Sequence, residues 1–196
     1  MATMAPAESV HPVTFDIAYP EQLNRWLILV KWLLAIPQLI IANLLDNVAQ
    51  LLAFVAFFTI LFTGKWPEGM FKFTVGCLRW QYNVYAYAFL MRDEYPPFSL
   101  DPGQYAVAFD VAYPEKLNRW LVFIKWLLII PNAIVFLFVA LAWVITLIVA
   151  WFAILFTGRY PRGLFDFAVG VMRWSARINA YVYLMTDKYP PFGTSA

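Results

Sequence analysis

The pattern of apolar and polar residues divides the chain into two long apolar runs, each followed by a shorter aromatic segment. The runs cover 26–63 and 120–157 and contain few charged residues. At about 1.5 Å per residue, a helix of this length measures about 57 Å, nearly twice the ~30 Å thickness of a bilayer's hydrocarbon core. One straight membrane crossing therefore does not accommodate either run.

We expect each run to fold into a hairpin of two short membrane helices. In the first run, Asn43, Asp46 and Asn47 lie near the middle, where polar residues suit a turn at the membrane surface better than a lipid-facing helix. The second run has no turn residue at its midpoint, 137–141. The hairpin thus accounts for the first run more directly than for the second.

The alternative is a single crossing by each run. Residues 26–36 would then lie at the interface, Pro37 would kink the chain, and 38–63 would cross once, with Pro131 in the equivalent role. A single crossing leaves cations on both faces, whereas a hairpin gathers them on one face, which the positive-inside rule makes cytoplasmic. This charge pattern favours the hairpin and cytoplasmic termini. The cations concerned are Arg25, Lys65, Lys72, Arg119, Arg159 and Arg162.

A mostly aromatic segment follows each run, at 70–92 and 164–186. Its polar positions recur in steps of four, three and four, which places them on one narrow stripe of a helix. The stripe consists of Lys72, Gly76, Arg79 and Asn83 in the first copy, and of Asp166, Gly170, Arg173 and Arg177 in the second. Such a helix lies in the membrane interface, or spans the membrane with its stripe facing other helices.

The second half of the chain repeats the first. Residues 15–98 align with 109–192 without a gap at an offset of 94, and 43 of the 84 aligned positions are identical, which establishes a duplication. We expect the two repeats to be parallel. The predicted division is a tail (1–14), a first membrane repeat (15–98), a linker (99–108), a second membrane repeat (109–192) and a final tail (193–196).

Two local signals recur in both copies. Thr-Gly ends each apolar run, at Gly64 and Gly158, and predicts the end of a helix with the glycine at positive φ. Alternating apolar and polar residues begin each repeat, at 15–19 and 106–113, and predict short extended segments before the next proline.

Composition also favours a membrane protein. The chain is 63% hydrophobic and 13% charged, with a mean hydropathy of +0.66, whereas about 25% of the residues of a soluble domain are charged. The net charge of +2 is too small to indicate nucleic-acid binding. The single cysteine, Cys77, excludes an intrachain disulfide, and the one histidine, His11, lies in a polar tail, so we expect no cofactor. Residues 1–12 lack the pattern of a cleaved signal peptide.

Five motifs occur in both copies: Tyr-Pro-Glu-x-Leu-Asn-Arg-Trp-Leu, Lys-Trp-Leu-Leu-x-Ile-Pro, Leu-Phe-Thr-Gly-x-x-Pro-x-Gly, Arg-Trp and Tyr-Pro-Pro-Phe. Together they resemble a family of bacterial membrane proteins that is classed as a domain of unknown function and is often carried in tandem. The resemblance covers nearly the whole chain apart from the first dozen residues and the linker. It implies a protein of the bacterial inner membrane and supplies no activity. The first repeat departs from the second where apolar residues are replaced by Asn43, Asp46, Asn47 and Gln50.

The candidate site residues are cations and aromatic residues at the expected membrane interface. An arginine among aromatic residues can bind a lipid phosphate through two hydrogen bonds, and anionic lipid is the first choice for Arg79 and Arg173. The expected headgroup contacts are Arg79, Arg173, Arg177, Lys65 and Arg159. The expected interfacial anchors are Trp26, Trp66, Trp80, Trp120, Tyr160 and Trp174.

We expect structural roles for the other charged residues. Asp16 pairs with Arg25 or caps a turn, and Lys31 extends its side chain to the interface. Asp46 lies in the hairpin turn, and Asp93 lies at an exposed helix end. The same roles are expected for the equivalent residues Asp110, Arg119, Lys125 and Asp187.

These patterns predict an all-α polytopic membrane protein with about four membrane helices and two interfacial ones. The favoured function is non-catalytic, as a scaffold or accessory subunit that packs against a larger membrane complex, lipids or another copy. The alternative is lipid binding or transport along a path lined by Arg79, Arg173, Asn83 and Arg177. A membrane enzyme needs a reactive set of side chains that the membrane repeats lack, since their composition offers no Ser-His-acid or Cys-His set.

Overall fold

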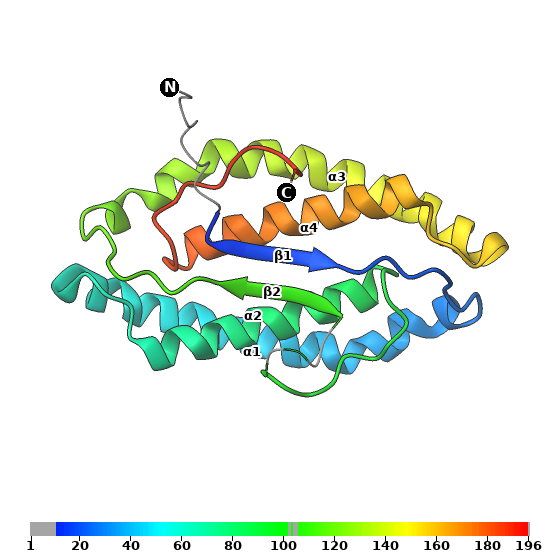
Figure 1. Ribbon diagram of the computed structural model, residues 1–196, viewed down its shortest axis with the longest axis horizontal. Coiled ribbons are helices and arrows are strands. Elements are labelled where there is room, and N and C mark those ends of the chain that lie inside the picture. The colour runs from blue at the N-terminus through cyan, green and yellow to red at the C-terminus, as the bar shows by residue number, and fades with distance from the viewer. Residues whose placement is uncertain (1–10, 102, 104–105, 196) are drawn as a thin grey trace, which may run out of the picture.

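The computed structural model describes residues 11–101, 103 and 106–195, and its elements recur in the same order in both halves (Figure 1). Residues 1–10, which belong to the predicted tail (1–14) and to the segment without a signal-peptide pattern, lie outside the described residues. The elements are β1 (Val13–Ile17), α1 (Leu27–Thr63), α2 (Glu68–Ala88), β2 (Val107–Val111), the short 3-10 helix η1 (Leu121–Phe123), α3 (Lys125–Thr157) and α4 (Arg162–Val182).

The two predicted extended segments form a small antiparallel sheet. β1 pairs with β2, and Phe15 lies opposite Phe109 in the register. These two phenylalanines are equivalent positions of the two repeats, so an approximate twofold axis passes between them. The fold is therefore not all-α as predicted, because each repeat contributes one strand to a sheet that neither repeat could form alone.

The expectation of parallel repeats is wrong. The colours in Figure 1 show α1 running from right to left and α3 from left to right, with α2 and α4 also opposed. The antiparallel pairing of β1 with β2 imposes this arrangement, because equivalent strands that run in opposite directions reverse everything that follows them.

The predicted hairpins are also wrong. α1 is one continuous helix of 37 residues, and α3 is one of 33. The polar residues in the middle of α1 do not need a turn, because the side-chain amides of Asn43 and Asn47 donate to the carbonyls of Leu39 and Asn43, four residues earlier. The alternative with a separate segment before Pro37 also differs, since Pro37 lies inside the helix.

The predicted helix ends are confirmed. Gly64 has φ 73° and Gly158 has φ 71°, and each follows the last residue of a long helix. Each glycine carbonyl then accepts a hydrogen bond from the other repeat, with Leu117 N–H donating to Gly64 O and Leu23 N–H to Gly158 O, both at 2.8 Å. The Thr-Gly motif of one copy thus anchors the Tyr-Pro-Glu-x-Leu motif of the other.

Replacement of Gly64 by valine should lower the free energy of unfolding by about 1 to 3 kcal/mol, because a β-branched side chain tolerates positive φ poorly. Gly158→Val should cost more, since a Cβ there would lie 3.0 Å from Arg25 Nε, compared with 3.4 Å from Arg119 Nε at Gly64. Chemical unfolding in detergent measures both variants. Gly69→Ala is the control, because no atom lies within 4 Å of its Cβ position, and equal stability of all three variants would contradict the prediction.

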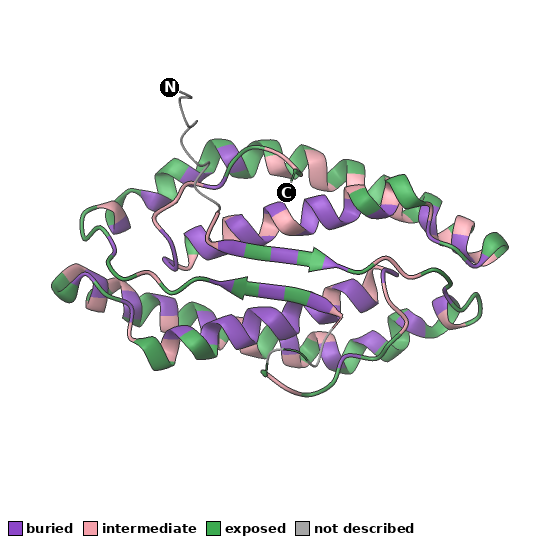
Figure 2. Ribbon diagram, viewed as in Figure 1, coloured by how far each residue is buried: buried purple, intermediate pink, exposed green. Residues whose placement is uncertain are grey.

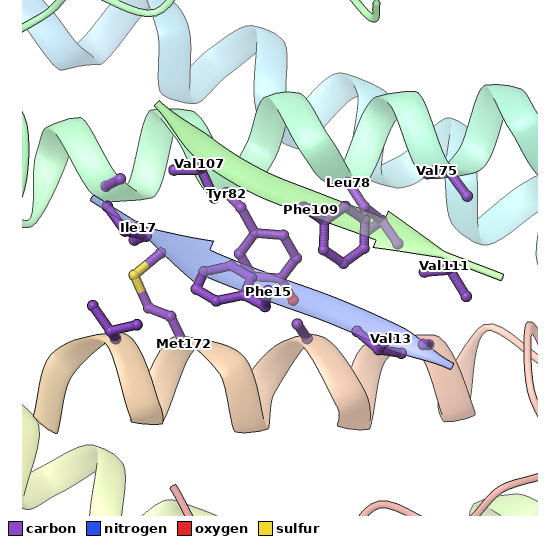
Figure 3. Packing of buried hydrophobic residues seen from close by; sticks show 14 of the residues in the cluster. Val13, Phe15, Ile17, Val75, Leu78, Tyr82, Val107, Phe109, Val111 and Met172 are labelled. Atoms are coloured by element: carbon purple, nitrogen blue, oxygen red, sulfur yellow. The ribbon is translucent and has the colours of Figure 1, made fainter. Parts of the chain in front are cut away.

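Side-chain burial divides the molecule into layers (Figure 2). β1 and β2 bury alternate residues, and α2 and α4 pack beneath them and are buried over much of their surface. Phe15, Phe109 and Tyr82 meet where the strands contact α2 (Figure 3), and the ring centroids of Phe15 and Phe109 lie 5.3 and 5.1 Å from that of Tyr82. α1 and α3 pack mainly on α2 and α4 through one buried stripe, and the rest of their apolar surface is exposed.

Candidate functional site

The prediction that the lysines in the apolar runs extend to an interface is wrong, because Lys31 and Lys125 are buried. Lys31 Nζ lies 2.6 Å from Asp93 Oδ1 and donates to Arg92 O at 2.7 Å, with its side chain 1% exposed. Asp93 also accepts a hydrogen bond from Asn24 N–H, so its carboxylate is not a free helix end. The second copy repeats this arrangement with Lys125, Asp187, Thr186 and Asn118.

The Arg-Trp and Tyr-Pro-Pro-Phe motifs also meet in the interior. The indole N–H of Trp80 donates to Gln38 Oε1 at 2.9 Å, and the Gln38 amide donates to Pro96 O at 2.7 Å. Trp174, Asn132 and Pro190 form the same chain in the second copy. These buried contacts join each long helix to the segment that ends the repeat, which gives the recurring motifs a structural role.

The arginines chosen for lipid phosphate bind protein groups instead. Arg79 is 8% exposed and donates to the carbonyls of Phe109 and Leu100, and its guanidinium lies 3.3 Å from an oxygen of Asp110. Arg173 donates to Phe15 O and lies 3.3 Å from Asp16, in the equivalent place. The predicted pairs of Asp16 with Arg25 and of Asp110 with Arg119 are therefore wrong, because the sheet brings each aspartate to a helix of the other half.

The remaining headgroup candidates separate into buried and exposed residues. Arg177 is buried and donates to Ser195 O. Lys65 and Arg159 are exposed beside the helix-ending glycines. Of the five cations, only these two present their charged groups openly to the surroundings.

The six predicted anchors separate in the same way. Trp26 and Trp120 are 76% and 77% exposed at the starts of the two long apolar segments, so they can reach an interface. Trp66 and Tyr160 are completely buried, because each packs edge-to-face against a phenylalanine at the start of the next helix. Trp80 and Trp174 are also buried, and their indole N–H groups donate the hydrogen bonds described above. These four cannot contact headgroups.

The repeats differ most in chemistry along one face of α1. Asn43, Asp46, Asn47 and Gln50 correspond to Leu137, Ala140, Leu141 and Val144 in α3. Both helices have the same neighbours in the fold, so packing alone does not require a charged or amide side chain here. Departure from the internal symmetry therefore marks this face as the candidate functional site.

The polar face of α1 meets the end of α4 in a hydrogen-bonded cluster. Tyr183 donates its phenolic proton to Asp46 Oδ1 at 2.6 Å, and the Gln50 amide donates to Asp46 Oδ2 at 2.8 Å. Burial and the neighbouring Asp46 carboxylate raise the pKa of Tyr183 above its usual value, so the phenol remains a donor at neutral pH. Next to it, the Asn179 amide donates to the Tyr82 hydroxyl at 2.8 Å. The expected turn at Asp46 is thus a contact between the repeats.

A groove of about 720 Å³ opens beside this cluster, between α1, the start of α3 and the end of α4. Its polar end consists of Gln50, Asn179 and Tyr183, with Lys125 held in its ion pair. Its volume lies within the usual range of small-molecule sites, about 300–1,000 Å³. The apolar walls include Phe54, Phe57, Val122, Trp126, Ile129 and Val182.

The twofold-related groove is smaller and apolar. It measures about 330 Å³ and is lined by Ile28, Trp32, Ala88, Leu90, Leu147, Ile148 and Trp151. Part of the space is filled, because Trp151 replaces Phe57 and Phe89 packs edge-to-face against Trp143 at a centroid distance of 4.5 Å. Phe89 also replaces Tyr183, which removes the hydroxyl. The polar groove is therefore a property of one side of the molecule.

Sequence reasoning located half of this cluster. The departure at 43–50 was visible in the comparison of the repeats, and it contains Asp46 and Gln50. Tyr183 and Asn179 were missed, because they lie about 130 residues away and only the antiparallel assembly brings them to α1. The same comparison of the repeats could have found them, since the first repeat has Phe89 in place of Tyr183 and Tyr85 in place of Asn179. Among the described residues, no three His, Cys, Asp or Glu side chains form a group that could hold a metal ion.

Comparison with protein families identifies the class of the chain. Two copies of a family model match it, at residues 25–99 and 119–193, and together they contain all four long helices. The chain belongs to this family, DUF4389, which is described as a domain of unknown function. No curated protein and no solved structure matches the chain.

Proposed function

We propose that the chain is a non-catalytic protein of the bacterial inner membrane, held in lipid by α1 and α3. The observation that carries this proposal is the exposure of the two helices. Both are long and apolar enough to cross a membrane, yet only 28% of the most apolar stretch of α1 and 6% of that of α3 is buried in the protein. A helix in the core of a soluble protein would be mostly buried, so another apolar phase is needed to cover these faces.

The charge distribution supports an orientation with the long axis in the membrane plane. β1 and β2 lie midway along the molecule (Figure 1). Asp16 and Asp110, at exposed positions of these two strands, are 74% and 69% exposed. If the long axis crossed the bilayer, both carboxylates would lie near its centre, where charge is costly. With the long axis in the plane, the sheet faces water and α1 and α3 face lipid. This orientation replaces the multi-pass arrangement, which depended on hairpins that the fold lacks.

A scaffold or accessory role agrees with this arrangement. The rigid frame of buried ion pairs leaves two long apolar faces available to lipids, to a larger membrane complex or to another copy. Lys65 and Arg159 lie beside the ends of α1 and α3, so they are placed to contact lipid headgroups.

Membrane extraction and cysteine labelling test the proposal. The protein should stay in the membrane pellet after an alkaline carbonate wash. In sealed vesicles, a water-soluble maleimide should label Ala108→Cys on the outer face of the sheet at least tenfold faster than Ile145→Cys on the exposed face of α3. Wild type is the control, since Cys77 is buried and burial raises its pKa to about 11. Release by carbonate, or equal labelling at both positions, would contradict the proposal.

A further inference from the structure

The polar end of the larger groove offers side-chain amides and, among the described residues, no unpaired cation. Gln50 must turn its amide nitrogen to Asp46, because an ionised carboxylate only accepts hydrogen bonds. Its oxygen Oε1 therefore remains as an acceptor. Asn179 donates one N–H to Tyr82, which leaves its oxygen Oδ1 as a second acceptor and its other N–H as a donor. Tyr183 spends its single proton on Asp46.

Lys125, the cation that lines the groove, already has partners within the protein. Lys125 Nζ is 2.7 Å from Asp187 and donates to Thr186 O, and it lies 5.1 Å from the centroid of the Tyr181 ring. These three partners occupy the three directions of the ammonium group. The Asp46 carboxylate, which accepts hydrogen bonds from the lining residues Gln50 and Tyr183, forms no ion pair with a described residue. An anionic headgroup would therefore meet a like charge.

The rest of the groove is apolar and open. Phe54 and Trp126, on its two walls, are 62% and 67% exposed. A hydrocarbon chain can lie between these two side chains without burying a polar group, and the polar group of the same molecule can reach Gln50 and Asn179. Its shape and chemistry are those of a site for an amphiphile.

We propose that this groove binds a membrane lipid with an uncharged, hydroxyl-bearing head, whose hydroxyl donates to Gln50 or Asn179 and whose acyl chain packs between Phe54 and Trp126. This inference rests on the proposed membrane location of α1 and α3. An uncharged hydroxyl can donate to an amide oxygen and accept from an amide N–H without placing a second charge in an apolar site. The lack of a free cation among the described lining residues disfavours lipids with an anionic phosphate, which reverses the preference expected from Arg79 and Arg173.

Photolabelling in lipid nanodiscs tests this site. The protein is placed in phosphatidylcholine nanodiscs that contain a trace of diacylglycerol with a diazirine on one acyl chain, and labelled peptides are mapped by mass spectrometry. Phosphatidic acid with the same chains and diazirine is the comparison, since it differs only by the phosphate. We expect diacylglycerol to label residues 50–57 and 122–129 at least fivefold more than phosphatidic acid. Equal labelling by the two probes overturns the proposal.

Internal symmetry supplies variants that the fold accepts. Asp46→Ala, Gln50→Val and Tyr183→Phe each introduce the residue that the other repeat has at the equivalent position. The triple variant should reduce labelling by diacylglycerol at least fivefold. Trp151→Phe, the matched exchange in the opposite groove, should leave it unchanged. Full labelling of the triple variant overturns the proposal.

Two further measurements keep the outcome decisive. Gln50 is exposed, so Gln50→Val alone should fold and should lower labelling at least twofold, and an unchanged value would count against the site even if the triple variant failed to assemble. Flotation with vesicles separates the two proposals. A chain that does not float refutes the membrane location, whereas a chain that floats without preferring diacylglycerol refutes only the lipid site.

Discussion

Replacing Asp93 by alanine is expected to destabilise the protein by about 3 kcal/mol or more. The substitution leaves Lys31 charged inside the protein, with the carbonyl of Arg92 as its remaining hydrogen-bond partner among the described residues. Removal of one member of a buried ion pair typically costs about 3–5 kcal/mol. It also removes the acceptor for the backbone N–H of Asn24, just before α1. Asp187→Ala should have a similar effect through Lys125, because the second repeat has the same contacts.

Chemical unfolding in detergent measures these changes, and a double-mutant cycle assigns them to the pair. If the cost comes from the unpaired charge, Lys31→Met combined with Asp93→Ala should be more stable than Asp93→Ala alone. Lys72→Met is the matched control, because Lys72 pairs with Glu68 on an exposed helix surface and its loss should hardly move the midpoint. Equal effects of Asp93→Ala and Lys72→Met would show that burial does not govern these pairs.

Local sequence signals predicted local structure well. Gly64 and Gly158 end helices at positive φ, as a glycine after a long apolar run indicates. The alternation at the start of each repeat predicted β1 and β2 to within two residues at their starts. Both signals depend on a few neighbouring residues, so they can be recognised without knowing the distant contacts, although β1 and β2 pair only across the two repeats.

The errors concern side chains that bond to their own helix and residues whose partners are far away in the sequence. Asn43 and Asn47 suggested a turn because amides avoid lipid, but they bond to their own helix. Lys31 suggested an interfacial cation, but it pairs with a residue 62 positions away. The duplication itself says nothing about relative direction, which follows from the pairing of Phe15 with Phe109. For the candidate site, comparison of the repeats indicated the α1 half, and only the fold added Tyr183 and Asn179.

Arg79→Gln is expected to destabilise the protein by about 3 kcal/mol and to leave the retention of anionic lipid unchanged. The buried guanidinium donates to the carbonyls of Phe109 and Leu100 and contacts Asp110, so it joins β2 and the segment after α2 to the helix. Hydrogen bonds to charged groups contribute about 1.5–3 kcal/mol each, and glutamine cannot replace all of them. With its donors engaged, the side chain has little capacity left for a lipid phosphate.

Comparison with its twofold equivalent and with exposed cations makes this result decisive. Arg173 donates to one backbone carbonyl, Phe15 O, and its side chain is 16% exposed against 9% for Arg79, so Arg173→Gln should cost about half as much. Lys65→Gln and Arg159→Gln should show the reverse pattern, with lower retention of phosphatidylglycerol in mild detergent and nearly unchanged unfolding. Loss of anionic lipid from Arg79→Gln without loss of stability would restore the phosphate contact inferred from the Arg-Trp motif. If Arg79→Gln and Arg173→Gln lower the stability without loss of lipid, both arginines serve to hold the sheet to α2 and α4.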